Sequence, residues 1–196
     1  LVFFVHTDPA TLWSGQWMGD DRMEMWGWST GVAAHEGFHA MGIDHANLLS
    51  CVDSLGSQMS LDGTCASAGY GDRYDVQGSG LGRHPNVRTK ARLGWLCEDE
   101  LVTVSETDFG TCRYELDPLE APAGGLLGVR VPADRVRFDW GDIGFSPSAG
   151  AETYYYLEYR QPIGADAALA GTEAVQGVSV RLGSSLNDAF LTLLVD

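Results

Sequence analysis

The sequence predicts an α+β fold with few helices, and three observations carry that prediction. The chain has 196 residues, 44% of them hydrophobic, which is enough for a packed core. Helix signals are confined to residues 29–42 and 86–94, whereas strand-like runs dominate residues 101–195. We therefore expect a first part, residues 1–96, with an incomplete mixed sheet and a helix, followed by a β-rich, sandwich-like module at residues 97–196.

The elements of the first part follow from local signals. Residues 1–5 and 23–28 are expected to form strands, since the first run is apolar and the second alternates Met23 and Met25 with Glu24 and Trp26. Ser29 or Thr30 can cap a helix that Gly42 ends. A second helix is expected from Asn86 to Leu93, before Gly94.

The second part is expected to consist of strands separated by turn signals, such as those at residues 122–125 and 146–150. The chain opens and stops inside strand-like runs, so we expect it to be a piece of a longer protein. The predicted strands are residues 101–105, 113–116, 126–131, 153–160, 175–182 and 189–195.

The net charge and hydropathy of the sequence argue against some classes of binding partner. Acidic residues outnumber basic ones 27 to 12, and the formal net charge is -15, so nucleic acid and anionic membranes are poor partners. The sequence contains no run of about 18 apolar residues, so no membrane span is predicted. An acidic balance of this kind more often serves solubility than function, and it fits an extracellular or high-salt setting.

The four cysteines are even in number and lie in loop-like surroundings. Pairing Cys51 with Cys65 and Cys97 with Cys112 would close two short loops, which is one of three possible connectivities. The alternative is four free, buried cysteines in a cytosolic protein. No CxxC spacing indicates a cysteine metal site.

One histidine-rich segment predicts metal chemistry. His35 and His39 are four residues apart on the expected helix, so both rings can reach one ion. Gly42 permits the sharp turn that brings His45 back as a third ligand. Glu36 lies beside these ligands, where its carboxylate can hold a metal-bound water as a general base. Three neutral histidines leave one tetrahedral position of a Zn²⁺ ion open, as in catalytic zinc sites.

The pattern HExxHxxGxxH at residues 35–45 resembles that of the metzincin zinc endopeptidases. Residues 70–78, 90–96 and 154–160 are similar to stretches of the gametolysin-like metallopeptidases and their bacterial relatives. The resemblance covers most of residues 31–160. It implies a metzincin-like catalytic part, truncated at its N-terminus, in a secreted or cell-surface protease that acts on protein or peptide substrates. It also implies one Zn²⁺ held by His35, His39 and His45, with Glu36 as the catalytic residue.

The chain departs from this family in two ways. The family places a methionine in a tight turn beneath the zinc, whereas Gln77 stands at the equivalent position here. An amide in a buried place needs hydrogen-bond partners, so we expect Gln77 to weaken the site and Gln77→Met to raise thermal stability or zinc affinity. The family's domain opens with further strands and a long helix, whereas only 34 residues precede His35, so we expect part of the sheet to be absent from this segment. The resemblance implies that the strand at residues 23–28 borders the cleft and can bind substrate as an added strand.

Further residues are weaker candidates. Tyr70 and Tyr74 could stabilise an oxyanion, although packing is the plainer role for both. Asp72 and Asp75 could bind Ca²⁺, but their spacing is not that of a known calcium loop. His6 and His84 are expected to be ordinary surface or loop residues.

The leading hypothesis is a secreted zinc endopeptidase in which Glu36 is the general base. The alternative from another class is a binding module that kept the fold but lost activity, which Gln77 and the missing front favour. A structural zinc protein would need a fourth protein ligand, and the motif supplies only three.

Overall fold

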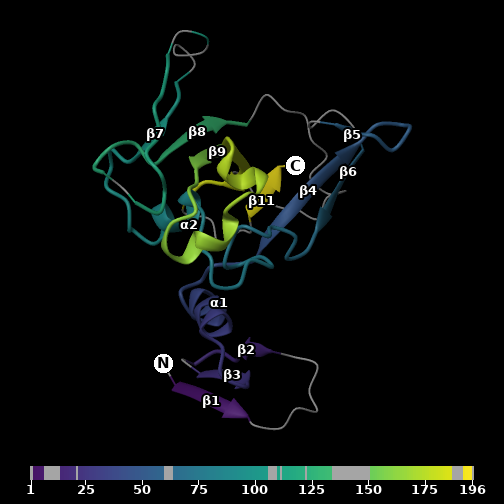
Figure 1. The fold of residues 1–196 in the computed structure, drawn as a ribbon, viewed down its shortest axis with the longest axis vertical. Helices are drawn as coiled ribbons and strands as arrows, with labels where there is room; N and C mark the ends of the chain where they lie inside the picture. The colour runs from purple at the N-terminus through teal and green to yellow at the C-terminus, as the bar shows by residue number, and fades with distance from the viewer. Residues whose placement is uncertain are drawn as a thin grey trace.

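The computed structural model describes residues 2–6, 14–20, 22–59, 64–105, 110, 112–121, 123–133, 151–186 and 192–195. It is a mixed α+β protein built mostly from strands, as predicted. Figure 1 shows helix α1 between a small sheet at the N-terminal end of the molecule and a larger sheet that holds the C-terminal strands.

The small sheet has three strands in the order β1-β3-β2. β1 (Val2–His6) runs parallel to β3 (Arg22–Trp26), and β2 (Gly15–Trp17) runs antiparallel to it. Both predicted N-terminal strands are therefore present. Because β3 is paired on both sides, it cannot accept a further strand, and the edge strand in contact with α1 is β2.

Helix α1 spans Thr30–Ala40, close to its predicted bounds. Ser29 is its N-cap, and the Ser29 side chain accepts a hydrogen bond from Val32 N. Val32 packs against the buried Met23 and Met25 of β3, while Phe38 packs on the opposite side with Ile43 and Val76. The helix is thus fixed between the small sheet and the rest of the molecule.

The second predicted helix is also present. α2 spans Val87–Arg92, and the Asn86 side chain caps it by accepting from Thr89 N. Gly94 follows with a φ of +71°, the left-handed conformation that glycine adopts most easily. Two short 3-10 helices, η2 (Gly164–Leu169) and η3 (Glu173–Val175), lie between the last strands.

The large sheet has eight strands, in the order β5-β4-β11-β10-β9-β8-β7, with β6 paired to β4. β4 lies parallel to β11 through the register Ala46↔Thr192. One sheet therefore takes strands from both predicted parts, and the described strands of residues 97–196 lie in this sheet rather than in two facing sheets. The strands are β4 (Ala46–Val52), β5 (Gln58–Met59), β6 (Thr64–Ala68), β7 (Leu101–Thr103), β8 (Gly128–Pro132), β9 (Thr153–Tyr159), β10 (Val178–Ser184) and β11 (Thr192–Val195).

The strand predictions were wrong at two places. Residues 113–116 do not form a strand, and this segment is largely exposed. β4, β5 and β6 were not predicted. Residues 189–191 of the last predicted strand lie outside the described residues.

Two of the four cysteines form a disulfide. Cys51 and Cys65 are register partners in the antiparallel pair of β4 and β6, and their sulfurs are bonded. The predicted bond between Cys97 and Cys112 is wrong: both residues are exposed and neither is in a disulfide. Strand pairing aligns the first two cysteines, and no described strand pairing brings Cys97 opposite Cys112.

No helix in the described part of the chain is long and apolar enough to cross a membrane.

Candidate metal centre

The three predicted histidine ligands meet in one place. His35 and His39 project from the same face of α1, and their ring centroids are 4.8 Å apart. Gly42 takes a φ of +75°, so the chain turns back after the helix and brings the His45 ring to 4.6 Å from that of His39. One ligand atom from each ring lies within 4.8 Å of the others. Within the described residues, this is the group of side chains placed to share a metal ion.

Backbone carbonyls fix the rings of the two helical histidines. His35 Nδ1 lies 2.7 Å from Val76 O, and His39 Nδ1 lies 2.8 Å from Ile43 O. Because a carbonyl oxygen only accepts, each Nδ1 must carry the proton and donate it. Each Nε2 then keeps a lone pair for a metal, which is the usual arrangement of a ligating histidine.

Burial favours the neutral, metal-binding form of the cluster. Desolvation, helped by the nearby His39 ring, lowers the pKa of His45 to about 4. Burial also lowers the pKa of His35. Both rings are therefore uncharged at neutral pH, which is the form in which histidine ligates a metal.

The third ligand is anchored from both sides of its backbone. His45 O accepts a hydrogen bond from Thr192 N, at the start of β11. The next residue, Ala46, begins β4 and donates from its N–H to Gln77 O at 3.0 Å. His45 is thus held at the end of the large sheet, against the loop that contacts His35.

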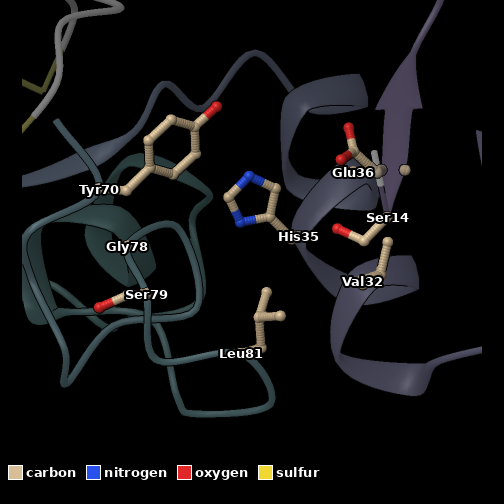
Figure 2. A pocket seen from close by; sticks show the side chains of 9 residues that line it. Ser14, Val32, His35, Glu36, Tyr70, Gly78, Ser79 and Leu81 are labelled. Carbon is tan, nitrogen blue, oxygen red and sulfur yellow. The ribbon is translucent and has the colours of Figure 1, made fainter. Parts of the chain in front are cut away.

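Glu36 lies beside the cluster and is only 7% exposed. Its Oε2 accepts a hydrogen bond from Trp17 N of β2 at 2.7 Å. Figure 2 shows His35 between Glu36 on one side and Tyr70 on the other. Two cavities of about 380 and 490 Å³ share Gly15, Glu36 and Tyr70 in their walls, so Glu36 stands where they adjoin.

The two candidate tyrosines lie in different places. The Tyr70 ring is 3.9 Å from that of His45 between centroids, and Tyr70 lines both cavities. Its φ is +58°, an uncommon value for an aromatic residue, and its N–H donates to Asn47 Oδ1. Tyr74 is buried and its hydroxyl donates to Glu173, in the wall of another cavity. The structure therefore brings Tyr70, and not Tyr74, to the histidines.

Gln77 lies directly beneath His39. Its Nε2 is 3.2 Å from His39 Nδ1 and donates weakly to Ile43 O at 3.4 Å. The side chain is 1% exposed, and its Oε1 has no hydrogen-bond partner among the described residues. The Gln77 amide therefore has a hydrogen bond for its nitrogen and none for its oxygen. The sequence predicted that an amide at this position would need hydrogen-bond partners.

Asp72 and Asp75 are fully buried and serve the protein's own groups. Asp72 Oδ2 accepts from Arg181 Nε at 2.9 Å, and Arg181 also pairs with Glu158. Asp75 accepts from the backbone of Gln77 and from Asn86. These contacts engage both carboxylates, and neither belongs to the group of side chains placed to share a metal.

The other two histidines stay apart from the centre. His84 N donates to Asp166 Oδ1, and burial lowers the pKa of its ring. The side chain of His6 lies outside what the structure describes.

Sequence reasoning missed four contributors to the centre: the Val76 and Ile43 carbonyls, the Trp17 N–H and the Asp75 carboxylate. The first three are backbone groups, which carry no residue-type signal. Asp75 does lie in the Asp- and Gly-rich stretch at residues 70–78 that was singled out, so its place there was the one available clue.

None of the family models, curated proteins or solved structures compared with this chain matches it. The functional argument therefore depends on the geometry alone. Three imidazoles, two of them with Nδ1 bound to carbonyls, suit a borderline metal such as Zn²⁺ better than Ca²⁺ or Mg²⁺, which prefer oxygen ligands.

Proposed function

We propose that this chain is the catalytic part of a secreted zinc endopeptidase of the metzincin type. The observation that carries the proposal is the position of Glu36, held beside three converging histidines and between two adjoining cavities. A structural zinc site needs a fourth protein ligand, and the cluster in the described part of the chain contains three.

In the proposed hydrolysis, the metal ion and Glu36 have different roles. A bound Zn²⁺ would polarise the peptide carbonyl and lower the pKa of water at the site. Glu36 Oε2 is held by Trp17 N, so Oε1 is the oxygen that takes a proton from the attacking water. The water oxygen bonds to the carbonyl carbon, the C–N bond breaks, and Glu36 returns the proton to the leaving nitrogen.

The edge of β2 that faces away from β3, where no other described strand pairs, supplies a place for the substrate backbone. Trp26 N donates to Ser14 O and Met18 N donates to Arg22 O, so residues 14 and 18 turn their polar groups toward β3. The backbone groups of Gly15 must then face the opposite side, where Gly15 lines both cavities. An extended peptide can pair there as an added strand and pass Glu36.

Tyr70 faces the cluster from the other wall. Burial, together with the Glu36 and Asp44 carboxylates, raises the pKa of its hydroxyl. The phenol therefore stays protonated at neutral pH and can donate a hydrogen bond to the oxygen that becomes negative during attack.

The Cys51–Cys65 disulfide is compatible with an extracellular protein, and it supports the secreted location in this proposal.

The test compares Glu36→Gln with the wild-type chain for casein hydrolysis and for zinc content. We expect hydrolysis to fall by a factor of about 10² to 10⁴ while one zinc per chain is retained, because the substitution removes the base and no ligand. Glu115→Gln, at an exposed carboxylate outside the site, is the matched control and should keep full activity.

Two outcomes would contradict the proposal. A wild-type chain that holds zinc but hydrolyses nothing would favour a binding module, and a chain that holds no zinc would remove the basis of the site.

A further inference from the structure

The orientation of His35 depends on one peptide group. His35 Nδ1 donates to Val76 O at 2.7 Å, and Val76 lies in a turn region, outside any helix or strand. The carbonyl of Val76 and the N–H of Gln77 belong to the same planar peptide unit. Whatever holds the Gln77 N–H therefore also sets the direction of the carbonyl that His35 meets.

Asp75 holds that N–H. Its Oδ1 accepts from Gln77 N at 2.7 Å, so a carboxylate, a peptide and an imidazole follow one another in a hydrogen-bonded chain. A negative charge on the N–H side of a peptide draws that proton and makes its carbonyl a stronger acceptor. In many zinc sites a carboxylate bonds the ligand histidine directly and raises its basicity, and here a single peptide stands between them.

The carboxylate is itself rigidly placed. Asp75 is fully buried, and its Oδ2 accepts from both the backbone N and the side-chain Nδ2 of Asn86, each at 2.7 Å. Asn86 is the N-cap of α2 and also donates from Nδ2 to Thr192 Oγ1. The position of the Val76–Gln77 peptide is thus tied to a helix and to a strand of the large sheet.

We propose that Asp75 is a positioning residue that orients His35 and raises its basicity through the Val76–Gln77 peptide. The inference rests on the metal-binding role given to His35 in the proposed function. Asp75 does not touch the metal site, so its effect must appear in how tightly the site holds zinc and in the hydrogen bond of His35 itself.

Asp72 offers a matched control in the same loop. It is fully buried, and its Oδ1 accepts from the N–H of the residue two positions later, Tyr74 N, as Asp75 does from Gln77 N. The carbonyl of the Arg73–Tyr74 peptide unit, however, belongs to Arg73, and the carbonyl that His35 Nδ1 meets is that of Val76. Asp72→Asn also weakens a buried ion pair with Arg181, so it is the more severe test of a general loss of a buried carboxylate, whereas an effect on His35 should be confined to Asp75.

The experiment measures Zn²⁺ affinity by chelator competition for the wild-type chain, Asp75→Asn and Asp72→Asn. We expect Asp75→Asn to raise the Kd for Zn²⁺ by a factor of about 10 to 100, which is the usual effect of losing a group that orients a ligand. Asp72→Asn should change this Kd less than about threefold. Equal losses in the two variants would overturn the inference, because they would show only that the loop needs its carboxylates.

Asp75→Asn also places an amide N–H opposite the donors of Asn86 and could fail to fold. The double variant D75N/N86D returns an acceptor opposite the new amide and keeps one negative charge in the buried cluster. We expect it to regain thermal stability but not the wild-type Kd. Recovery of both would overturn the inference.

A second readout needs no metal. In the metal-free chain, NMR of the His35 ring should show a proton fixed on Nδ1, and its signal should move upfield in Asp75→Asn as the hydrogen bond weakens, but not in Asp72→Asn. An unmoved signal would overturn the inference. A wild-type chain that binds no Zn²⁺ would overturn the proposed function, and the NMR result would then decide the role of Asp75 alone.

Discussion

Replacing Gln77 by methionine should stabilise the protein. The Gln77 side chain is 1% exposed and lies under His39, where its Oε1 meets no donor among the described residues and its Nε2 reaches Ile43 O at 3.4 Å. Methionine has nearly the same length and volume and presents no polar group that needs a partner. The change therefore removes an unmet acceptor at the cost of one long hydrogen bond.

The two effects differ in size. A buried polar atom without a partner costs about 1–3 kcal/mol, whereas a hydrogen bond as long as that to Ile43 contributes about 0.5 kcal/mol. Ile43 O also keeps the donor His39 Nδ1, so it is not left unsatisfied. The net gain in unfolding free energy is roughly 1–2 kcal/mol, which corresponds to a rise in Tm of about 2–8 °C for a chain of this size.

Calorimetry of the metal-free chain measures this rise directly, and chelator competition tests whether zinc is also held more tightly. Gln77→Glu is the control of matched shape: it places a second acceptor opposite Ile43 O and should lower Tm. An unchanged or lower Tm for Gln77→Met would refute the reasoning, since it would mean that Oε1 is satisfied or that the amide contributes more to the site than its contacts indicate.

Two further predictions concern stability. Reducing the disulfide, or replacing Cys51 and Cys65 by serine, should cost about 3 kcal/mol in urea unfolding, because the bond closes a loop with a sequence separation of 14; a loss below about 1 kcal/mol would contradict this. Burial and the neighbouring Asp166 raise the pKa of Glu120 from 4.5 to about 7. The protonated carboxyl therefore stabilises the folded state, and this stabilisation is fully present below pH 4.5 and is lost as the pH rises through 7. Glu120→Gln should therefore match the wild type near pH 4.5 and be more stable at pH 8, by about 1 kcal/mol for this partly exposed group; equal urea midpoints at pH 8 would disprove it.

Local signals predicted those parts of the fold that depend on nearby residues. The cap at Ser29 and the turn at Gly42 define α1 within the segment itself, and the alternation in β9 reflects a strand with one face against the core. β4 was missed because its place depends on pairing with β11, more than a hundred residues later, and a sequence window cannot detect that partner.

In the candidate site, too, features set by nearby residues could be predicted and those set by distant residues could not. The spacing of His35, His39 and His45 was enough to predict that they converge, because helix periodicity and one glycine turn determine it. The groups that orient His35 and Glu36 could not be predicted, because they are a carbonyl and an N–H group brought in from other segments, at Val76 and Trp17. Every residue carries such groups, so only the folded chain shows which of them reach the site.

The loop at residues 72–79 connects the histidines to the large sheet. On one side it supplies Val76 O to His35 and Gln77 O to the residue after His45. On the other side, Asp72 binds Arg181 of β10, and Arg160 donates to Tyr74 O at 2.7 Å while pairing with Asp166. Removing one partner of such a buried ion pair leaves an uncompensated charge and is far more costly than losing an exposed pair. The buried arginines therefore act on the site indirectly, because they fasten to the large sheet the loop that supplies Val76 O to His35 and Gln77 O to the residue after His45.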